Sequence, residues 1–436
     1  MFSYYLRLAL LSMRKNAVLS SLMIIAIGLG IGACMTIITV NYIMSSDPIP
    51  HKSAQLFAVQ LDTWSPHSPF QEPDRPPDQV TYLDATRLME AKRGFRQTAN
   101  AGAGYVVEPE NQDIKPFQIR GRANFADFFA MFDTPFIYGG GWDAEDDNSR
   151  ALVTVLSREL NDRLFGGENS VGRSVRMAGQ VFQVVGVMDD WSPIPRFYDL
   201  TSNPYAESAE AYVPFHTHVD NELPGSGNTN CWKPPGDGLE AFLNSECVWI
   251  QFWVELPSLA EQQAYLDYLD SYANEQKALG RFERPLNNRI QDVNAWLSYN
   301  EVVAEEAQVM LAIALMFLTV CLLNTIGLLL SKFVGKAGEI GLRRALGATR
   351  GTLFAQYMIE AAMIGLLGGA LGVVLSWLGL AGLDLLFGQL ISNLTQMDWV
   401  MVLTAVALAL LSSIAAGLYP TWKACNIQPS AQLKAQ

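Results

Sequence analysis

Two histidines and an aspartate close together in the sequence carry side chains of the kind that bind metal ions. They are His216, His218 and Asp220. Two histidines one residue apart share a face of a strand, but a zinc site needs three or four ligands at suitable spacing. No cysteine or third ligand stands nearby at a recognisable spacing. The pattern therefore predicts an ordinary polar loop, and we expect no metal site.

Motifs for nucleotide binding and hydrolysis are absent from the sequence. The closest approach to the phosphate-binding pattern GxxxxGK[ST] is Gly335-Lys336, but Ala337 follows the lysine and Leu330 occupies the first glycine position. HExxH and GxSxG are also missing. Because an ion relay needs ionisable groups at membrane depth, acids confined to the ends of apolar segments disfavour an ion-coupled transporter. We expect no catalysis by this chain and no cofactor bound to it. The acids beside apolar segments are Glu360, Asp384 and Asp398.

Four long uncharged segments must set the architecture. They contain 31 residues after Lys15, then 25, 23 and 24 residues in 307–331, 361–383 and 399–422. A helix crosses the hydrocarbon core with about 20 apolar residues. The first run is longer than a signal-peptide core and no small-x-small cleavage site is obvious after it, so an uncleaved span is favoured over a signal peptide. We expect four transmembrane helices.

Basic residues beside the spans predict their orientation, since Lys and Arg gather on the cytoplasmic side. They lie before the first span, between the second and third, and after the fourth. We therefore expect a membrane protein with both termini in the cytoplasm and residues 45–310 outside. The basic residues are Arg7, Arg14, Lys15, Lys332, Lys336, Arg343, Arg344, Arg350, Lys423 and Lys434.

These spans divide the chain into predicted domains. Residues 2–15 are amphipathic and predict either a helix lying in the membrane interface or an extension of the first span. The predicted domains are a cytoplasmic interfacial helix (1–15), a first transmembrane helix (16–45), an outside α+β domain of two subdomains (46–300), a stalk end with the second transmembrane helix (301–331), a cytoplasmic loop (332–353), a third transmembrane helix (354–383), a short outside loop (384–398), a fourth transmembrane helix (399–420) and a cytoplasmic tail (421–436).

Charge is distributed very unevenly between these parts. The chain carries a formal net charge of −13. Residues 45–310 hold 20 of the 30 Lys and Arg and 39 of the 43 Asp and Glu, which gives −19, whereas the remainder gives +6. A nucleic-acid partner would require a basic stripe, and the outside domain is acidic instead. We expect membrane lipid and no nucleic acid as partners.

The outside domain alternates strand-like and helix-like pieces. Residues 151–156 and 181–188 predict strands, and residues 258–280 predict an amphipathic helix. A helix from about Asn294 is expected to continue unbroken into the second span. Residues 190–247 are rich in Pro, Gly, Asn and Ser and predict long surface loops. Because Cys231 and Cys247 lie there, on the oxidising side, we expect a disulfide between them.

The loop between the second and third spans carries the most specific pattern. Residues 336–350 read KAGEIGLRRALGATR, in which the basic residues alone would serve as a topological anchor. The segment resembles the (R/K)xxEIGxRxAxGAxR loop of the MacB/FtsX family of ABC transporter permeases. Further similarity lies in YMIE at 357–360, GLLGG at 365–369, the outside stretch 153–188 and the ending GLYPTWKACNIQPSAQLK. The tail departs from the family at Gln432, and the outer loop 215–247 is longer than usual.

The resemblance implies a fold, a mechanism and partners. It implies a membrane protein with four transmembrane α-helices and a large α+β periplasmic domain inserted between the first and second spans. It implies a location in the bacterial inner (plasma) membrane, a dimer with a second copy or paralogue, and a loop that docks on an ABC ATPase. Since 15 residues precede the first span, we expect that ATPase, with its ATP and magnesium, on a separate chain. The expected coupling residues are Glu339, Ile340, Gly341, Arg343, Arg344, Gly347 and Ala348.

Glycines four residues apart in the spans predict close helix contacts. These pairs are Gly28 with Gly32 and Gly365 with Gly369. The contacts are either packing within one protomer or a dimer interface through the first span.

The expected function is therefore that of a non-catalytic permease subunit. A partner ATPase would drive periplasmic movement and export of amphiphilic peptides, antibiotics or toxins, with a periplasmic adaptor and an outer-membrane channel. One alternative is a permease that releases lipoproteins. A second is an FtsX-like transmembrane regulator of a periplasmic hydrolase.

Overall fold

The chain divides into two compact units. The computed structural model describes residues 2–109, 111, 114–302, 305–387 and 399–426. Residues 1–45 and 303–436 form one unit, called here the helical domain. Residues 46–302 form the other, called the sheet domain.

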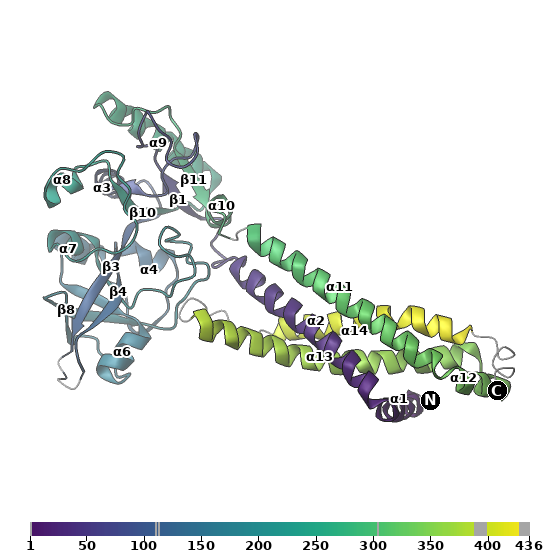
Figure 1. The fold of residues 1–436 in the computed structure, drawn as a ribbon. Helices are drawn as coiled ribbons and strands as arrows, with labels where there is room; N and C mark the ends of the chain where they lie inside the picture. The colour runs from purple at the N-terminus through teal and green to yellow at the C-terminus, as the bar shows by residue number, and fades with distance from the viewer. Residues whose placement is uncertain (1, 110, 112–113, 303–304, 388–398, 427–436) are drawn as a thin grey trace. The chain divides into compact units, whose positions relative to one another are not determined.

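The helical domain contains four long apolar helices that run alongside one another (Figure 1). Among the described residues, the segments long and apolar enough to cross a membrane are Ala17–Met44, Gln308–Val334, Arg350–Leu383 and Val402–Cys425. They confirm the four predicted spans. Two short helices, α1 and α12, accompany them. The helices are α1 (Phe2–Lys15), α2 (Ala17–Met44), α11 (Glu305–Val334), α12 (Ala337–Ala345), α13 (Arg350–Phe387) and α14 (Trp399–Cys425).

Helix ends differ from the sequence boundaries in several places. Helix α1 ends at Lys15 and α2 begins at Ala17, so the first segment is a separate helix. Helix α13 begins at Arg350 rather than 354, and α14 continues past Pro420 to Cys425. Parts of the predicted outside loop and tail, residues 388–398 and 427–436, lie outside the described residues.

The paired glycines let helices of this one chain approach closely. A Cβ atom on Gly28 would lie 2.8 Å from Cδ2 of Leu371 in α13, and one on Gly32 would lie 2.8 Å from Cβ of Leu375. Gly365 and Gly369 in turn face α14, where Ser413 and Ala409 fill the space. Larger side chains would separate the helices. Both pairs therefore pack against helices of the same chain, as one of the two readings that the sequence left open expects.

A mixed sheet of eleven strands forms the centre of the sheet domain in the described part of the chain. Its main path has the order β11-β1-β10-β3-β4-β9-β6-β8-β5, with β2 on β10 and β7 on β3 and β8. One sheet thus runs through the region for which the sequence predicts two subdomains. The strands are β1 (Leu56–Gln60), β2 (Val80–Thr81), β3 (Arg96–Glu108), β4 (Phe117–Asn124), β5 (Phe136–Gly139), β6 (Val153–Leu156), β7 (Ser174–Met177), β8 (Gln180–Met188), β9 (Ala211–Pro214), β10 (Val248–Glu255) and β11 (Arg289–Asp292).

Both faces of this sheet are covered. Successive side chains of a strand point to opposite faces, and Phe252 and Trp253 of β10 accordingly belong to different hydrophobic clusters. Helices α3 and α9 pack in the first cluster, and α4 and α10 in the second. Burial on two sides explains the near-continuous apolar strands. The helices here are α3 (Tyr82–Ala91), α4 (Asp127–Met131), α5 (Ala144–Ser149), α6 (Arg158–Phe165), α7 (Phe215–Asp220), α8 (Leu239–Leu243), α9 (Leu259–Ala278) and α10 (Val293–Tyr299).

The predicted unbroken helix into the second span is wrong. Helix α10 ends at Tyr299, and Glu301 has a φ of +48°, which a right-handed helix does not permit. Side chains from distant segments hold the bend. Arg75 donates to Oδ1 of Asn300 at 2.8 Å, and the Tyr205 hydroxyl donates to the carbonyl of Val302 at 2.7 Å.

Candidate functional site

The loop with the family pattern folds into the short helix α12. The helix ends at Ala345, Leu346 is its C-cap residue, and Gly347 follows with a φ of +101°. Its amide donates to the carbonyl of Arg344 at 3.1 Å, and that of Ala348 donates to the carbonyl of Arg343 at 3.0 Å. A left-handed residue after a helix is usually glycine because it has no Cβ. Gly347 therefore shapes the turn into α13, and half-buried Ala348 packs against the bundle core.

Several predicted coupling residues hold α12 onto the bundle. Ile340 is buried among the long helices. Arg343 donates to Oε1 of Glu339 at 2.6 Å, one turn away, and to Oε1 of Gln356 in α13 at 3.1 Å. Arg344 donates to the carbonyl of Cys425 at the end of α14, at 3.4 Å. These residues position the helix and leave its other face open.

The open face of α12 consists of small residues and two large apolar side chains. Leu342 is 63% exposed and Leu346 is 80% exposed. Residues three and four apart share a helix face, so Gly338, Gly341 and Ala345 lie beside these leucines. No atom would contact a Cβ on either glycine. Sequence reasoning missed Leu342 and Leu346. Their signal was an apolar pair, four residues apart, in a basic helix.

A buried ionic cluster lies beside this helix. Lys332, in the last turn of α11, places its Nζ 2.7 Å from Oε1 of Glu360 in α13. The same lysine donates to Oγ of Ser20 in α2 at 3.0 Å, and the Ser12 hydroxyl of α1 donates to Glu360. Lys336, the residue before α12, has its Nζ 3.9 Å from that carboxylate and donates to Ser12. Four helices and the start of α12 thus meet at one carboxylate.

Sequence reasoning placed Glu360 near a span end and gave it no role. The structure makes it the shared acceptor of two lysines that lie 24 and 28 residues before it in the sequence. Burial lowers the pKa of Lys336, and the Glu360 carboxylate raises it by less. Charge at this point is therefore costly without Glu360.

The predicted disulfide and the two histidines lie in the sheet domain. Cys231 and Cys247 form a disulfide. The free and buried cysteines of the described residues, Cys34, Cys321 and Cys425, lie in the helical domain instead. The polar loop expected around His216 and His218 is wrong, because both lie in helix α7 and His218 is buried against the Tyr105 hydroxyl, 3.0 Å from its Nδ1. No group of three or more metal-binding side chains occurs within the described residues.

Two protein-family models together match most of this chain. The model of the MacB-like periplasmic core domain matches residues 20–271. The model of the FtsX-like permease C-terminal region matches residues 311–429, which contain α12 and Glu360. The first match alone covers more than half of the chain.

Curated relatives share this similarity at low identity. The macrolide export ATP-binding/permease protein MacB of Syntrophobacter fumaroxidans is 25% identical over 70% of this chain and 46% of that protein. The pyoverdine export ATP-binding/permease protein PvdT of Pseudomonas entomophila is 24% identical over 80% and 48%. The chain spans about half the length of these relatives. The crystal structure of the periplasmic region of MacB from Actinobacillus actinomycetemcomitans aligns with a TM-score of 0.37 at 16% identity, over 58% of this chain and 95% of that one.

Proposed function

Since the chain belongs to the MacB/FtsX-like family of ABC transporter permeases, we propose that it is the permease subunit of an exporter driven by a partner ATPase. ATP and magnesium bind to the partner, and this chain itself is non-catalytic. The observation that carries the proposal is the open apolar face of α12, anchored by Leu342 and Leu346.

This face fits a docking surface on an ATPase. Exposed large apolar side chains that lie together, bordered by charge, are typical of protein interfaces. Arg343 and Arg350 border the face, while Glu339 and Gln356 hold Arg343 in place. The two leucines enter a pocket of the ATPase, and the arginines contact its rim.

Movement of the docked ATPase reaches the spans through the ionic cluster. Lys336 directly precedes α12, and Lys332 and Glu360 join α11 to α13. A shift of α12 therefore pulls on two spans at once. The sheet domain is inserted in the sequence between α2 and α11, so we infer that movement of these two spans is passed to it along the chain.

Export of amphiphilic compounds is the function that the relatives favour. Their names specify a macrolide in one case and pyoverdine in another. A periplasmic adaptor and an outer-membrane channel complete the route. The basic residues beside the spans support cytoplasmic termini in a bacterial inner membrane and a periplasmic sheet domain.

A second permease copy packs on α11. The glycine-lined side of α2 is already filled by α13. Helix α11 presents several large apolar side chains to its surroundings, which suits lipid on one side and a partner helix on the other. The exposed residues are Val309, Met310, Ile313, Leu315, Met316, Phe317, Val320 and Leu323.

Replacement of the two leucines tests the docking surface. The chain is purified from its native membrane in mild detergent, and the eluate is assayed for MgATP hydrolysis and for a chain with a GxxxxGK[ST] motif. The double variant Leu342→Gln, Leu346→Gln keeps helix-forming residues and removes the anchors. We expect the amount of ATPase that co-purifies with this variant to fall at least about tenfold, since interface anchors each contribute about 2 kcal/mol or more.

The matched control is Leu259→Gln, at an 81% exposed leucine of the sheet domain. It should retain the wild-type amount of ATPase. A wild-type eluate without ATPase, or a double variant that retains all of it, would contradict the proposal. Charge reversal at Arg343 is a poorer test because that side chain also holds α12 in place.

A further inference from the structure

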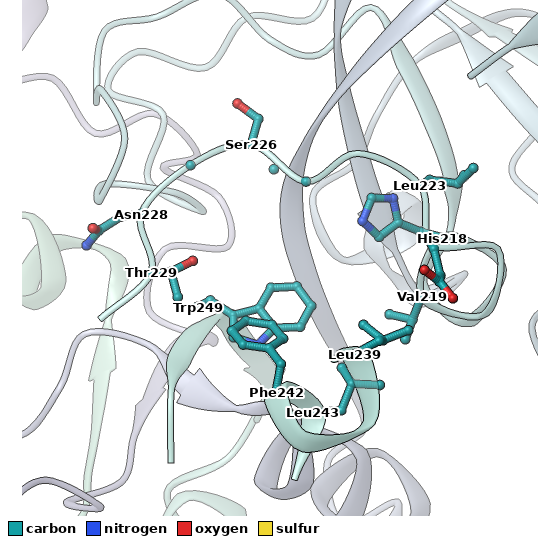
Figure 2. Close-up of a pocket in the computed structure, with 14 residues that line it drawn as sticks. His218, Val219, Leu223, Ser226, Asn228, Thr229, Leu239, Phe242, Leu243 and Trp249 are labelled. Carbon is teal, nitrogen blue, oxygen red and sulfur yellow. The ribbon is translucent and has the colours of Figure 1, made fainter. Parts of the chain in front are cut away.

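A second candidate site lies in the sheet domain, in a cavity of about 410 Å³. Small-molecule sites usually measure about 300–1,000 Å³. The cavity lies between α7, α8, β10 and the segment 225–229 (Figure 2). None of the predicted coupling residues contributes to it. Its role is therefore separate from that of α12.

Aromatic and aliphatic side chains make one wall of the cavity. Figure 2 shows the rings of Trp249 and Phe242 close together, with Leu239 and Leu243 nearby. The ring centroids of Trp249 and Phe242 are 5.9 Å apart, and Trp249 also stacks on Phe215 at 6.1 Å. This support fixes the indole as a flat apolar surface. Such a surface accepts another ring or a cation.

Charge on the cavity lining comes from a single residue. Among the described residues that line it, Glu222 alone carries a formal charge at neutral pH. Burial lowers the pKa of His218 to about 4, so this imidazole is neutral there. The other polar groups belong to uncharged residues, including Ser226, Asn228 and Thr229. The lining therefore favours a cation over an anion.

Covalent and backbone links hold the cavity open without a ligand. The Cys231–Cys247 disulfide closes the loop that carries α8 and joins it to the start of β10. The amide of Ser226 donates to the carbonyl of Gly102 in β3 at 3.0 Å, and the amide of Gly104 donates to the carbonyl of Pro224 at 3.1 Å. Segment 224–226 is thereby attached to the sheet. A preformed site loses less entropy when a ligand binds.

We propose that this cavity binds a small arylalkylamine, that is, an aromatic ring joined through an alkyl chain to an aliphatic ammonium group. The ring of the ligand lies against Trp249 and Phe242, and its positively charged nitrogen lies beside the Glu222 carboxylate. Ring stacking supplies the apolar contact. Cation–π attraction and the carboxylate supply the preference for a positive charge.

Three indoles that differ in charge test this site. Tryptamine is cationic, indole is neutral and indole-3-acetate is anionic. Their dissociation constants are measured by saturation-transfer NMR on the full chain in nanodiscs, with empty nanodiscs subtracted. We expect tryptamine to bind tightest and indole-3-acetate weakest, about fivefold or more apart, as one partly exposed ion pair provides.

Two substitutions locate the binding. Glu222→Gln should weaken tryptamine about twofold to fivefold and leave indole unchanged. Phe242→Ala should weaken all three compounds. The matched control Glu240→Gln removes the same charge from α8, at an exposed residue outside the cavity lining. Mass spectrometry of the linked Cys231 and Cys247 peptides verifies that each variant retains its folded loop.

The order of the three compounds on the wild-type chain is decisive even if a variant does not fold. Equal binding of all three, or no saturable binding of tryptamine, would overturn the proposal. So would an equal loss of tryptamine binding in Glu222→Gln and Glu240→Gln. None of these results bears on the ATPase experiment, so the two proposals fail independently.

Discussion

A fully buried ion pair lies in the sheet domain and another in the helical domain, and the two pairs have different surroundings. In the sheet domain, Arg122 lies 2.6 Å from Asp199, with side chains 3% and 2% exposed. In the helical domain, Lys332 lies 2.7 Å from Glu360, and both side chains are 1% exposed. Distance and burial alone would make them equivalent. The two pairs differ in the side chains that surround them and in how far they lie from the end of a helix or strand.

Side chains from several segments hold the sheet-domain pair. Arg122 lies inside β4, also donates to Asn100 of β3, and stacks over Tyr198 at 4.8 Å. Asp199 accepts further hydrogen bonds from Thr201 at 3.1 Å and Gln251 at 3.0 Å. Neither charge has a route to water without opening the sheet. This pair locks the centre of the domain.

The helical-domain pair lies beside a route to water. Lys332 is two residues from the end of α11, and its long apolar stem allows the ammonium to reach the membrane surface. Lys336, the second lysine at Glu360, is already partly exposed. We infer that the first pair serves stability and the second can exchange partners when α12 moves. Three substitutions test this difference.

Asp199→Ala should have the largest effect on stability. It leaves the Arg122 guanidinium buried without its carboxylate, which costs about 3–5 kcal/mol of unfolding free energy. The measurement is denaturant unfolding of the full chain in detergent, followed by near-UV circular dichroism. Asp199→Asn is the control, because it keeps hydrogen-bonding capacity and should cost less. A loss below about 1 kcal/mol for Asp199→Ala would show that Arg122 is not locked.

The pH dependence of this pair has a definite sign. Burial alone would raise the pKa of Asp199, but the charges of Arg122 and Arg196 outweigh it and lower the pKa. A carboxyl group with a lowered folded pKa contributes stability above its unfolded pKa, about 3.9, and loses it as the pH falls below that value. Asp199→Asn should therefore remove part of the stability loss seen below about pH 4.

Glu360→Ala should have an intermediate effect on stability and a larger one on coupling. Lys332 loses its carboxylate but can extend toward the cytoplasmic surface, so we expect a loss of about 1–3 kcal/mol. The rate of MgATP hydrolysis by the co-purified ATPase should no longer depend on the presence of the permease, because Lys332 of α11 no longer has its acceptor in α13. Glu360→Gln keeps the hydrogen bonds and should restore part of this dependence. A stability loss equal to that of Asp199→Ala would remove the distinction between the pairs.

Local sequence signals predicted the helices and strands better than the long-range contacts between them. The spans follow from uncharged runs. The sequence grouped Gly347 with the coupling residues, whereas the structure places it in the turn after α12, with a φ of +101° that suits glycine. The break before α11 had no local signal, since residues 294–306 contain neither Pro nor Gly. It is held by Arg75 and Tyr205, which lie far away in the sequence. Long-range hydrogen bonds of this kind leave no periodic pattern.

The candidate site shows the same limit. The loop pattern identified α12, yet it grouped Ile340, which is buried, with residues that face outward. Which side of a helix is covered depends on how α13 and α14 pack, and this short segment does not encode that. Lys332 belongs to the predicted cytoplasmic loop and Glu360 to the predicted third span, so a reading of each segment by itself could not pair them. Likewise, the parallel pairing of β4 with β9 joins strands separated by some ninety residues of chain.

Lys336→Met should have the smallest effect on stability. It tests how much each of the two lysines contributes to the interaction with the shared Glu360 carboxylate. Lys336 Nζ lies 3.9 Å from Glu360, against 2.7 Å for Lys332, and burial already lowers the pKa of Lys336. Removal of this charge relieves a desolvation cost and loses a weak attraction, so unfolding free energy should change by less than about 1 kcal/mol. Lys332→Met, measured in the same way, should lower the unfolding free energy by more, because the distant Lys336 is then the cation that remains beside Glu360. Equal losses for the two variants would mean that the carboxylate is shared evenly, and Glu360 could then change partners without moving α11.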